Sequence, residues 1–170
     1  MLYKKRGQVW IETVTYTLIA FVLIGLVIGF ARPKVEEIQD QSIIEQSIKI
    51  MRGLDSQIQE ISEKGDGNKR KLEMTIRKGD LFIDAPNDTL RFVIEGRFMY
   101  SQPGQSYIEG GLNITTIQNG KVYTVTLEKK YEDFNLLYNG KEEMKRLPRS
   151  STAYELFLLN NDSRIDFELD

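Results

Sequence analysis

Residues 13–31, TVTYTLIAFVLIGLVIGFA, form a run of nineteen residues without a charged side chain. As an α-helix with a rise of 1.5 Å per residue, this run would be roughly 28 Å long, close to the ~30 Å hydrocarbon thickness of a bilayer. Leu, Ile, Val and Phe make up most of it. We therefore expect a membrane-spanning helix that ends near Ala31.

The charges on the two sides of this run predict its orientation. Three basic residues precede it, and acidic residues predominate soon after it, beginning with Glu36 and Glu37. Basic residues are enriched on the cytoplasmic side of membrane helices. We therefore expect the N-terminus in the cytoplasm and the chain beyond Lys34 outside the cell. The three basic residues are Lys4, Lys5 and Arg6.

Two common kinds of N-terminal segment compare differently with this run. A secretory signal peptide has an apolar stretch of about 7–15 residues and a small-x-small cleavage site. The run here is longer and no A-x-A pattern follows it, which disfavours that interpretation. An uncleaved single-pass anchor accounts for the length and the orientation, and it remains open. It does not account for Glu12, a carboxylate at the edge of the apolar run, or for the KKRG-Q junction.

The residues around that junction carry a more specific pattern. The basic residues 4–6 are followed by Gly7 and Gln8, and Glu12 is the fifth residue counted from Gln8. This pattern resembles the class III signal peptide of archaeal type IV pilin-like proteins, whose short basic leader is removed by a prepilin peptidase. The chain departs from the family at Trp10, where a small serine is usual. The resemblance implies a leader of residues 1–7, cleavage between Gly7 and Gln8, and a mature chain that begins at Gln8.

The resemblance also implies a role for Glu12. Carboxylates within membrane segments usually mark function, because an unpaired charge in lipid is costly. Cleavage would expose an α-amino group on Gln8, with an ordinary pKa of about 7.7–8.0. In an assembly of pilin-like subunits, that amine would lie beside Glu12 of a neighbouring helix and set the register between them. The alternative is a glutamate that lies in the headgroup layer or caps the first helical turn.

The helical pattern continues beyond the membrane-spanning run. Apolar residues follow one another mostly at steps of three and four from residue 35 to residue 61, and Pro33 precedes them. We expect one helix over residues 8–64, with an amphipathic outer half. The apolar stripe would pack against the C-terminal domain or form a membrane-proximal coiled coil. The stripe consists of Val35, Ile38, Ile44, Ile48, Met51, Leu54, Ile58 and Ile61, and Ile43 and Ile50 widen it on one flank.

Residues 69–170 have the pattern of an extracellular β-rich domain. Short alternating runs are separated by turn residues, and Asn119-Gly120 between two of them predicts a hairpin. We expect an α+β fold in which the long helix packs against an antiparallel β domain, the architecture that the resemblance to type IV pilins implies. Strands are expected at residues 72–77, 81–83, 90–94, 112–118, 121–129, 134–138, 153–159 and 164–169.

The composition disfavours several classes of function. The chain has no histidine and no cysteine, so it lacks the commonest general base, the commonest metal ligand and any thiolate. The formal net charge is −2, and no basic stripe remains beyond the N-terminal cluster, which disfavours nucleic-acid binding. We expect no enzyme activity, no metal and no cofactor.

Three N-x-[ST] sequons lie on the expected outer side of the membrane and are candidate N-glycosylation sites. They begin at Asn87, Asn113 and Asn161, and Asn113 is the weakest candidate if it lies within a strand. These expectations describe a major or minor structural subunit of a type IV-like surface filament, which in the family serves adhesion, motility or DNA uptake. Its partners would be the prepilin peptidase, the membrane and other pilin-like subunits. The alternative is an uncleaved single-pass membrane protein whose β domain binds a surface ligand.

Overall fold

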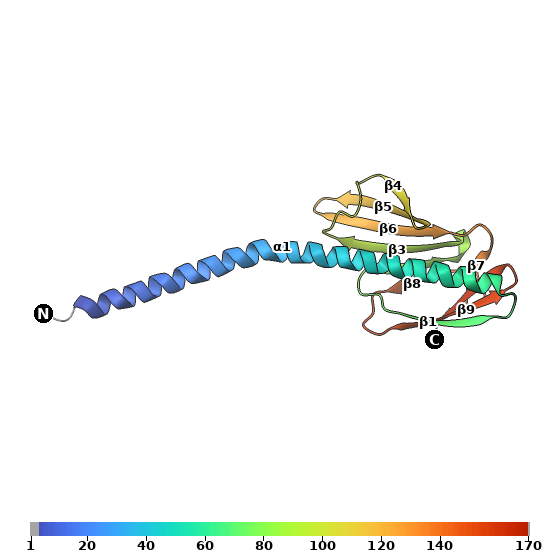
Figure 1. Cartoon of the computed structure of the whole chain (residues 1–170), viewed down its shortest axis with the longest axis horizontal. Coiled ribbons are helices and arrows are strands. Elements are labelled where there is room, and N and C mark those ends of the chain that lie inside the picture. The colour runs from blue at the N-terminus through green and yellow to red at the C-terminus, as the bar shows by residue number, and fades with distance from the viewer. Residues whose placement is uncertain (1–3, 170) are drawn as a thin grey trace. The chain divides into compact units, whose positions relative to one another are not determined.

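The computed structural model describes the backbone of residues 4–169 and the side chains of residues 9–169 (Figure 1). One long helix, α1, spans Lys4–Glu63 and continues through Pro33. The chain forms two compact units that divide within this helix, one up to Ile38 and one from Gln39 onward. The helix therefore contributes both to an apolar N-terminal segment and to a β domain, which gives the expected α+β layout.

The β domain contains two sheets and a short 3-10 helix. The four-stranded sheet has the order β1-β9-β10-β7, and the six-stranded sheet has the order β4-β5-β6-β3-β2-β8. The bounds are β1 Lys69–Met74, β2 Asp80–Asp84, η1 Ala85–Asn87, β3 Thr89–Gly96, β4 Ser106–Glu109, β5 Leu112–Asn119, β6 Val122–Lys130, β7 Asn135–Tyr138, β8 Met144–Pro148, β9 Tyr154–Asn161 and β10 Arg164–Leu169.

The expectation of an antiparallel domain is wrong for one pair of strands. β7 and β10 run parallel, whereas every other strand pair in the two sheets is antiparallel. Parallel neighbours need a long connection between them, and here β8 and β9 supply it. At the start of β7, the N–H of Leu136 donates to Asp88 Oδ1 at 2.8 Å, which ties this strand to the residue that follows η1.

The predicted strands differ from the structure in several places. β4 and β8 were not predicted, because β4 has four residues and β8 carries two basic residues and ends in Pro148, which a sheet tolerates only at its edge. β1 ends at Met74, three residues before the predicted end. The β5–β6 turn is Gly120-Lys121 and not Asn119-Gly120, because Asn119 pairs with Val122. Gly120, with a φ of 65°, supplies the positive φ that such a turn requires.

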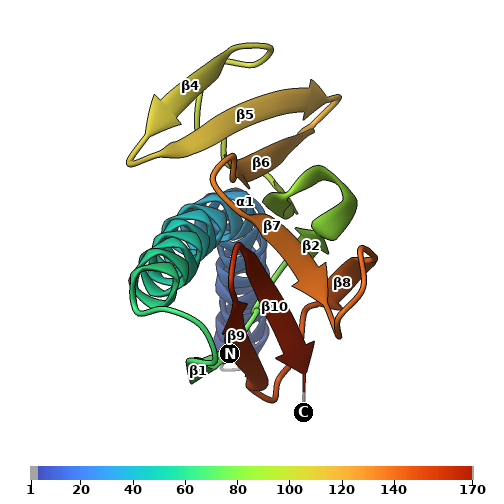
Figure 2. The ribbon, with the colours of Figure 1, turned by 90° about the vertical axis from the view of Figure 1, so that its right-hand side faces the viewer.

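The outer half of α1 is part of the core of the β domain. Figure 2 shows strands of both sheets around this part of the helix. Six residues of the predicted stripe are at most 4% exposed, and they share one hydrophobic core with both sheets: Ile44, Ile48, Met51, Leu54, Ile58 and Ile61. Burial of each such side chain stabilises the fold by about 1.5–3 kcal/mol. The stripe therefore packs within its own domain from Ile44 onward, whereas Val35 and Ile38 are exposed.

The C-terminal end of α1 is closed by a side chain from a distant strand. Asn160, on β9, is 1% exposed, and its amide donates to the carbonyl of Ile61 at 3.0 Å and to that of Gly65 at 2.9 Å. The last carbonyls of a helix have no partner within the helix, so a side chain that donates to them replaces water. Asn160 thus ties the end of the helix to β9.

Candidate functional site

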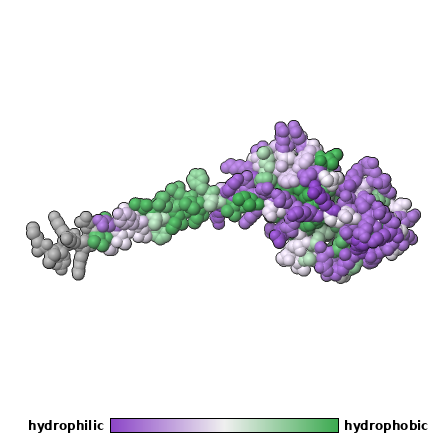
Figure 3. All heavy atoms as spheres, viewed as in Figure 1, coloured by the Kyte–Doolittle hydropathy of each residue, from purple (hydrophilic) through white to green (hydrophobic). Residues whose placement is uncertain are grey.

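The N-terminal part of α1 exposes apolar side chains on all its sides. Every large apolar residue from Val9 to Phe30 is at least 48% exposed, and Figure 3 shows a largely hydrophobic surface on this part of the helix, interrupted toward its N-terminal end by more hydrophilic residues. A helix that is apolar all round is normally buried in lipid or against other helices. This segment is long and apolar enough to cross a membrane, as predicted.

The hydroxyl groups of three threonines in this segment form hydrogen bonds within the helix itself. The hydroxyls of Thr13, Thr15 and Thr17 donate to the carbonyls four residues earlier, at 2.9, 2.8 and 2.7 Å. A hydroxyl satisfied in this way can lie in an apolar environment without a further partner. The run of residues 13–31 is therefore more compatible with lipid than the hydroxyl groups of these three threonines suggest.

Glu12 directly precedes the first of these threonines and is exposed. No hydrogen bond or ion pair joins it to any residue whose side chain the structure describes. The backbone of Lys4–Gln8 belongs to α1, so the predicted junction between Gly7 and Gln8 lies in helix. The first three residues of the predicted leader lie outside the described residues. The predicted partner of Glu12 is the α-amino group of a second subunit, so the role of Glu12 in assembly stays a prediction.

The three sequon asparagines lie on separate parts of the β domain. Asn87 is exposed at the end of η1, and its amide nitrogen donates to Asp84 Oδ1 at 2.9 Å. Asn113 is exposed but lies within β5, the position that makes it the weakest candidate. Asn161 is half-buried at the end of β9, directly before a tight turn. Glycosylation of these residues stays a prediction.

A buried carboxylate joins α1 to the six-stranded sheet, which the sequence did not indicate. Asp40 is 5% exposed, and it accepts hydrogen bonds from the backbone N–H of Arg97 at 2.6 Å and from the ammonium of Lys78. A Cβ on Gly96 would lie 2.7 Å from Asp40 Oδ2, so only glycine leaves room for this contact. Asp40 thus fixes the beginning of the packed half of α1.

A second polar contact holds the β4–β5 hairpin to the helix. Glu109 accepts hydrogen bonds from the hydroxyls of Tyr100 and Tyr107 at 3.1 and 3.3 Å, and Arg52 of α1 lies 2.9 Å from its other oxygen. The two tyrosine rings are stacked, with centroids 6.5 Å apart. Burial raises the pKa of both phenols, so both remain neutral donors. This cluster has the character of a structural contact.

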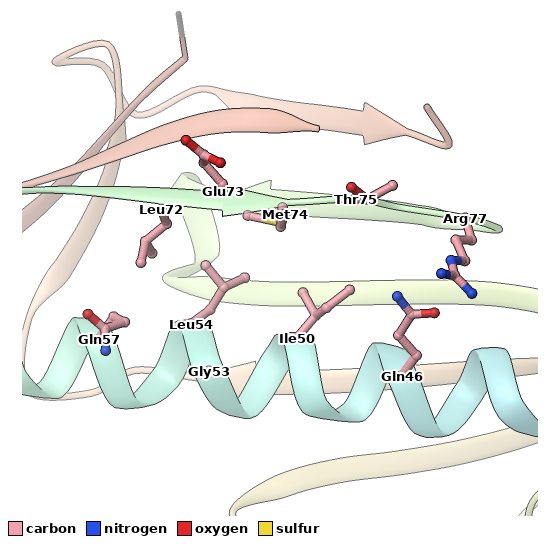
Figure 4. Close-up of a pocket in the computed structure, with 10 residues that line it drawn as sticks. All are labelled: Gln46, Ile50, Gly53, Leu54, Gln57, Leu72, Glu73, Met74, Thr75 and Arg77. Carbon is pink, nitrogen blue, oxygen red and sulfur yellow. The ribbon is translucent and has the colours of Figure 1, made fainter. Parts of the chain in front are cut away.

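A groove of about 640 Å³ lies between α1 and β1 (Figure 4). Its helix side is formed by α1 between Gln46 and Gln57, and its other side by residues 72–75 and Arg77. Among the described residues, no group of three or more acidic side chains is arranged to hold a metal ion. Sequence periodicity cannot show this groove, because the groove depends on how two distant segments lie together.

No protein family, no curated protein and no solved structure matches the chain.

Proposed function

We propose that the chain is a type IV pilin-like structural subunit of a surface filament, matured by removal of residues 1–7 and assembled through its apolar helix. The observation that carries this proposal is the segment Val9–Phe30, in which every large apolar side chain is exposed and the one charged residue is Glu12. Such a surface requires lipid before assembly and other apolar helices after it.

The position of Glu12 favours assembly over simple anchoring. A carboxylate at the edge of an apolar segment is retained where a partner compensates its charge. The new α-amino group of Gln8 in a neighbouring subunit is such a partner. Leaving one charge of a buried pair without its partner costs about 3–5 kcal/mol, so helices packed in the wrong register would be strongly disfavoured.

The remainder of the proposal concerns topology. The basic residues 4–6 favour a cytoplasmic N-terminus, and the β domain from Gln39 onward would then face the cell exterior. The sequons at Asn87, Asn113 and Asn161 would be accessible to an extracytoplasmic glycosylation system there. Adhesion, motility and DNA uptake are the family functions that such a filament would serve.

The N-terminus of the protein isolated from its native membranes tests the proposal. Intact mass and peptide sequencing should show a chain that begins at Gln8, and electron microscopy of the same cells should show filaments that contain it. A chain that begins at Met1 would contradict the proposal and leave the uncleaved anchor, whose β domain would then be examined for a surface ligand.

Two variants separate processing from assembly. Gly7→Val should block maturation, because the peptidase family requires a small residue before the cut. Glu12→Gln should mature and insert normally but give fewer filaments, because the length of the apolar segment is kept while the charge is lost. Glu63→Gln, at the exposed end of α1, is the matched control and should assemble normally. A normal filament yield from Glu12→Gln would contradict the register role.

A further inference from the structure

The groove between α1 and β1 is bordered by a strand edge that no other strand of the described residues covers. β1 pairs with β9 on one side only and is the last strand of its sheet. Residues of an antiparallel strand point their N–H and C=O groups alternately to the two sides, so half of the β1 backbone groups face away from β9. Among the described residues, no strand uses them.

The groove follows this edge. Residues 72–75 all line it, although the side chains of successive strand residues point to opposite faces. In Figure 4, Leu72 points toward the helix and Glu73 points away from it. Residues whose side chains point to opposite faces of the strand both line the groove, so the backbone between them lines it as well. An extended chain in this groove would therefore lie beside the free N–H and C=O groups of β1.

The floor of the groove is apolar and has space for a side chain. Ile50 and Leu54 face Leu72 and Met74 across it, and Gly53 lies between them on α1. A Cβ built on Gly53 meets no atom within 4 Å, so packing does not require glycine at this position. Glycine is also unfavourable within a helix. Its effect here is to leave the groove open.

One end of the groove carries two positively charged side chains, Arg77 and Arg149. An adjoining hollow is lined by Arg77, Arg149, Thr75, Ser150 and Ser151, and it shares Thr75 and Arg77 with the groove. Neither arginine forms an ion pair with any residue that the structure describes.

At the opposite end, the basic side chains of β1 are already engaged. Arg70 bonds to Glu60 and Gln57, Lys69 pairs with Glu168, and Lys71 pairs with Glu155. The charge available to a ligand is thus concentrated at Arg77 and Arg149.

We propose that this groove binds an extended acidic peptide segment of a partner protein, which adds to the free edge of β1 as a further strand. Its backbone pairs with β1, an apolar side chain enters the space above Gly53, and a carboxylate lies between Arg77 and Arg149. Main-chain pairing and side-chain pockets together are the usual basis of recognition at a sheet edge. This proposal does not depend on cleavage of the leader or on filament assembly.

Fluorescence anisotropy on the full chain in detergent micelles tests the proposal. The probe is a labelled eight-residue peptide of alternating valine and threonine that ends in two aspartates. It should bind, and a peptide that ends in two lysines should bind about tenfold more weakly, because two exposed ion pairs are lost. Every second backbone nitrogen of the acidic peptide can be methylated in two ways, starting from the first or from the second residue. One of the two methylated peptides should not bind, because it lacks the N–H groups that face β1. No binding of the acidic peptide at about 1 mM would overturn the proposal.

Two sets of variants locate the binding. Gly53→Leu fills the space beside Ile50 and should weaken binding by about tenfold or more without loss of folding. Gln59→Leu adds the same side chain to an exposed position of α1 outside the groove and should bind as the original chain does. The double variant Arg77→Gln, Arg149→Gln should weaken binding of the acidic peptide by about five- to tenfold and should not weaken binding of the lysine peptide.

Two results would refute the proposal even if the acidic peptide binds. Unchanged binding to Gly53→Leu would show that the peptide lies elsewhere, for example on the micelle-embedded segment. Equal binding of the two methylated peptides would exclude strand addition and leave an apolar anion as the occupant. Hydrogen exchange gives an independent check, because the proposal requires slower exchange of those backbone N–H groups of residues 72–74 that face away from β9 when the acidic peptide is present.

Discussion

Replacement of Asp40 by alanine should lower the unfolding free energy of the β domain by about 2–4 kcal/mol. The carboxylate is 5% exposed and accepts the N–H of Arg97 at 2.6 Å. A hydrogen bond to a charged group contributes about 1.5–3 kcal/mol. The ion pair with Lys78 adds about 0.2–1 kcal/mol, because the lysine side chain is 36% exposed and water screens it. The sum of these two contributions gives the expected loss.

The asparagine variant separates the two contributions. Asp40→Asn keeps a side-chain oxygen for the N–H of Arg97 but removes the charge that pairs with Lys78. Its loss should therefore be smaller, about 1–2 kcal/mol. An order of stability from the original chain through Asp40→Asn to Asp40→Ala is the specific signature of this contact.

Urea titration of the full chain in detergent micelles measures these differences, with the far-ultraviolet circular dichroism of the strands as the signal. The slope of the free energy against urea concentration should stay constant, since the variants change stability and not the surface exposed on unfolding. Gln39→Ala is the neighbouring exposed control and should change stability by less than about 0.5 kcal/mol. A loss of the same small size for Asp40→Ala would refute the reasoning, because it would mean that water satisfies the Arg97 N–H equally well.

Three further predictions concern the same domain. Ile58→Ala should cost about 2–5 kcal/mol in the same titration, because Ile58 is 0% exposed, and an effect no larger than that of Gln59→Ala would contradict the packing of α1. Gly79→Ala should cost about 1–3 kcal/mol, because φ is 84° and the new Cβ would lie 2.3 Å from the carbonyl oxygen of Val93; unchanged stability would show that this turn relaxes freely. Hydrogen bonds from Arg70, and then Lys64, lower the pKa of Glu60 from 4.5 to about 2. The stabilisation is thus present above pH 4.5 and is lost as the pH falls toward 2, so Glu60→Gln should flatten the curve of urea midpoint against pH in that window, and an unchanged curve would count against the prediction.

The part of the fold that depends on local periodicity was predictable. Steps of three and four residues identified the buried side of α1 from Ile44 to Ile61, because a helix returns to the same face at that spacing. The same pattern misassigned Val35 and Ile38, which continue the period but remain exposed. Periodicity shows which residues share a face, whereas burial also requires a partner surface opposite that face.

The features that depend on pairing between distant segments were not predictable. Asp40 has the sequence context of a solvated charge after a membrane helix, and its burial requires that Gly96 and Lys78 meet it in space. The parallel pairing of β7 and β10 depends on a connection through two intervening strands. The groove exists because β1 ends its sheet beside Gly53. In each case the residues that make the feature are more than twenty positions apart or belong to different elements.

The long helix serves two environments through separate groups of residues, and this separation makes the two proposals independently testable. The large apolar residues from Val9 to Phe30 are exposed, whereas the buried aliphatic residues begin at Ile44, so about a dozen mainly polar residues lie between the two groups. A change at Glu12 should therefore alter assembly without altering the urea midpoint of the β domain. A change at Gly53 should alter peptide binding without altering leader cleavage. If either substitution changed both properties, the two halves of α1 would have to be treated as one coupled element, and the division of roles argued from their burial would be wrong.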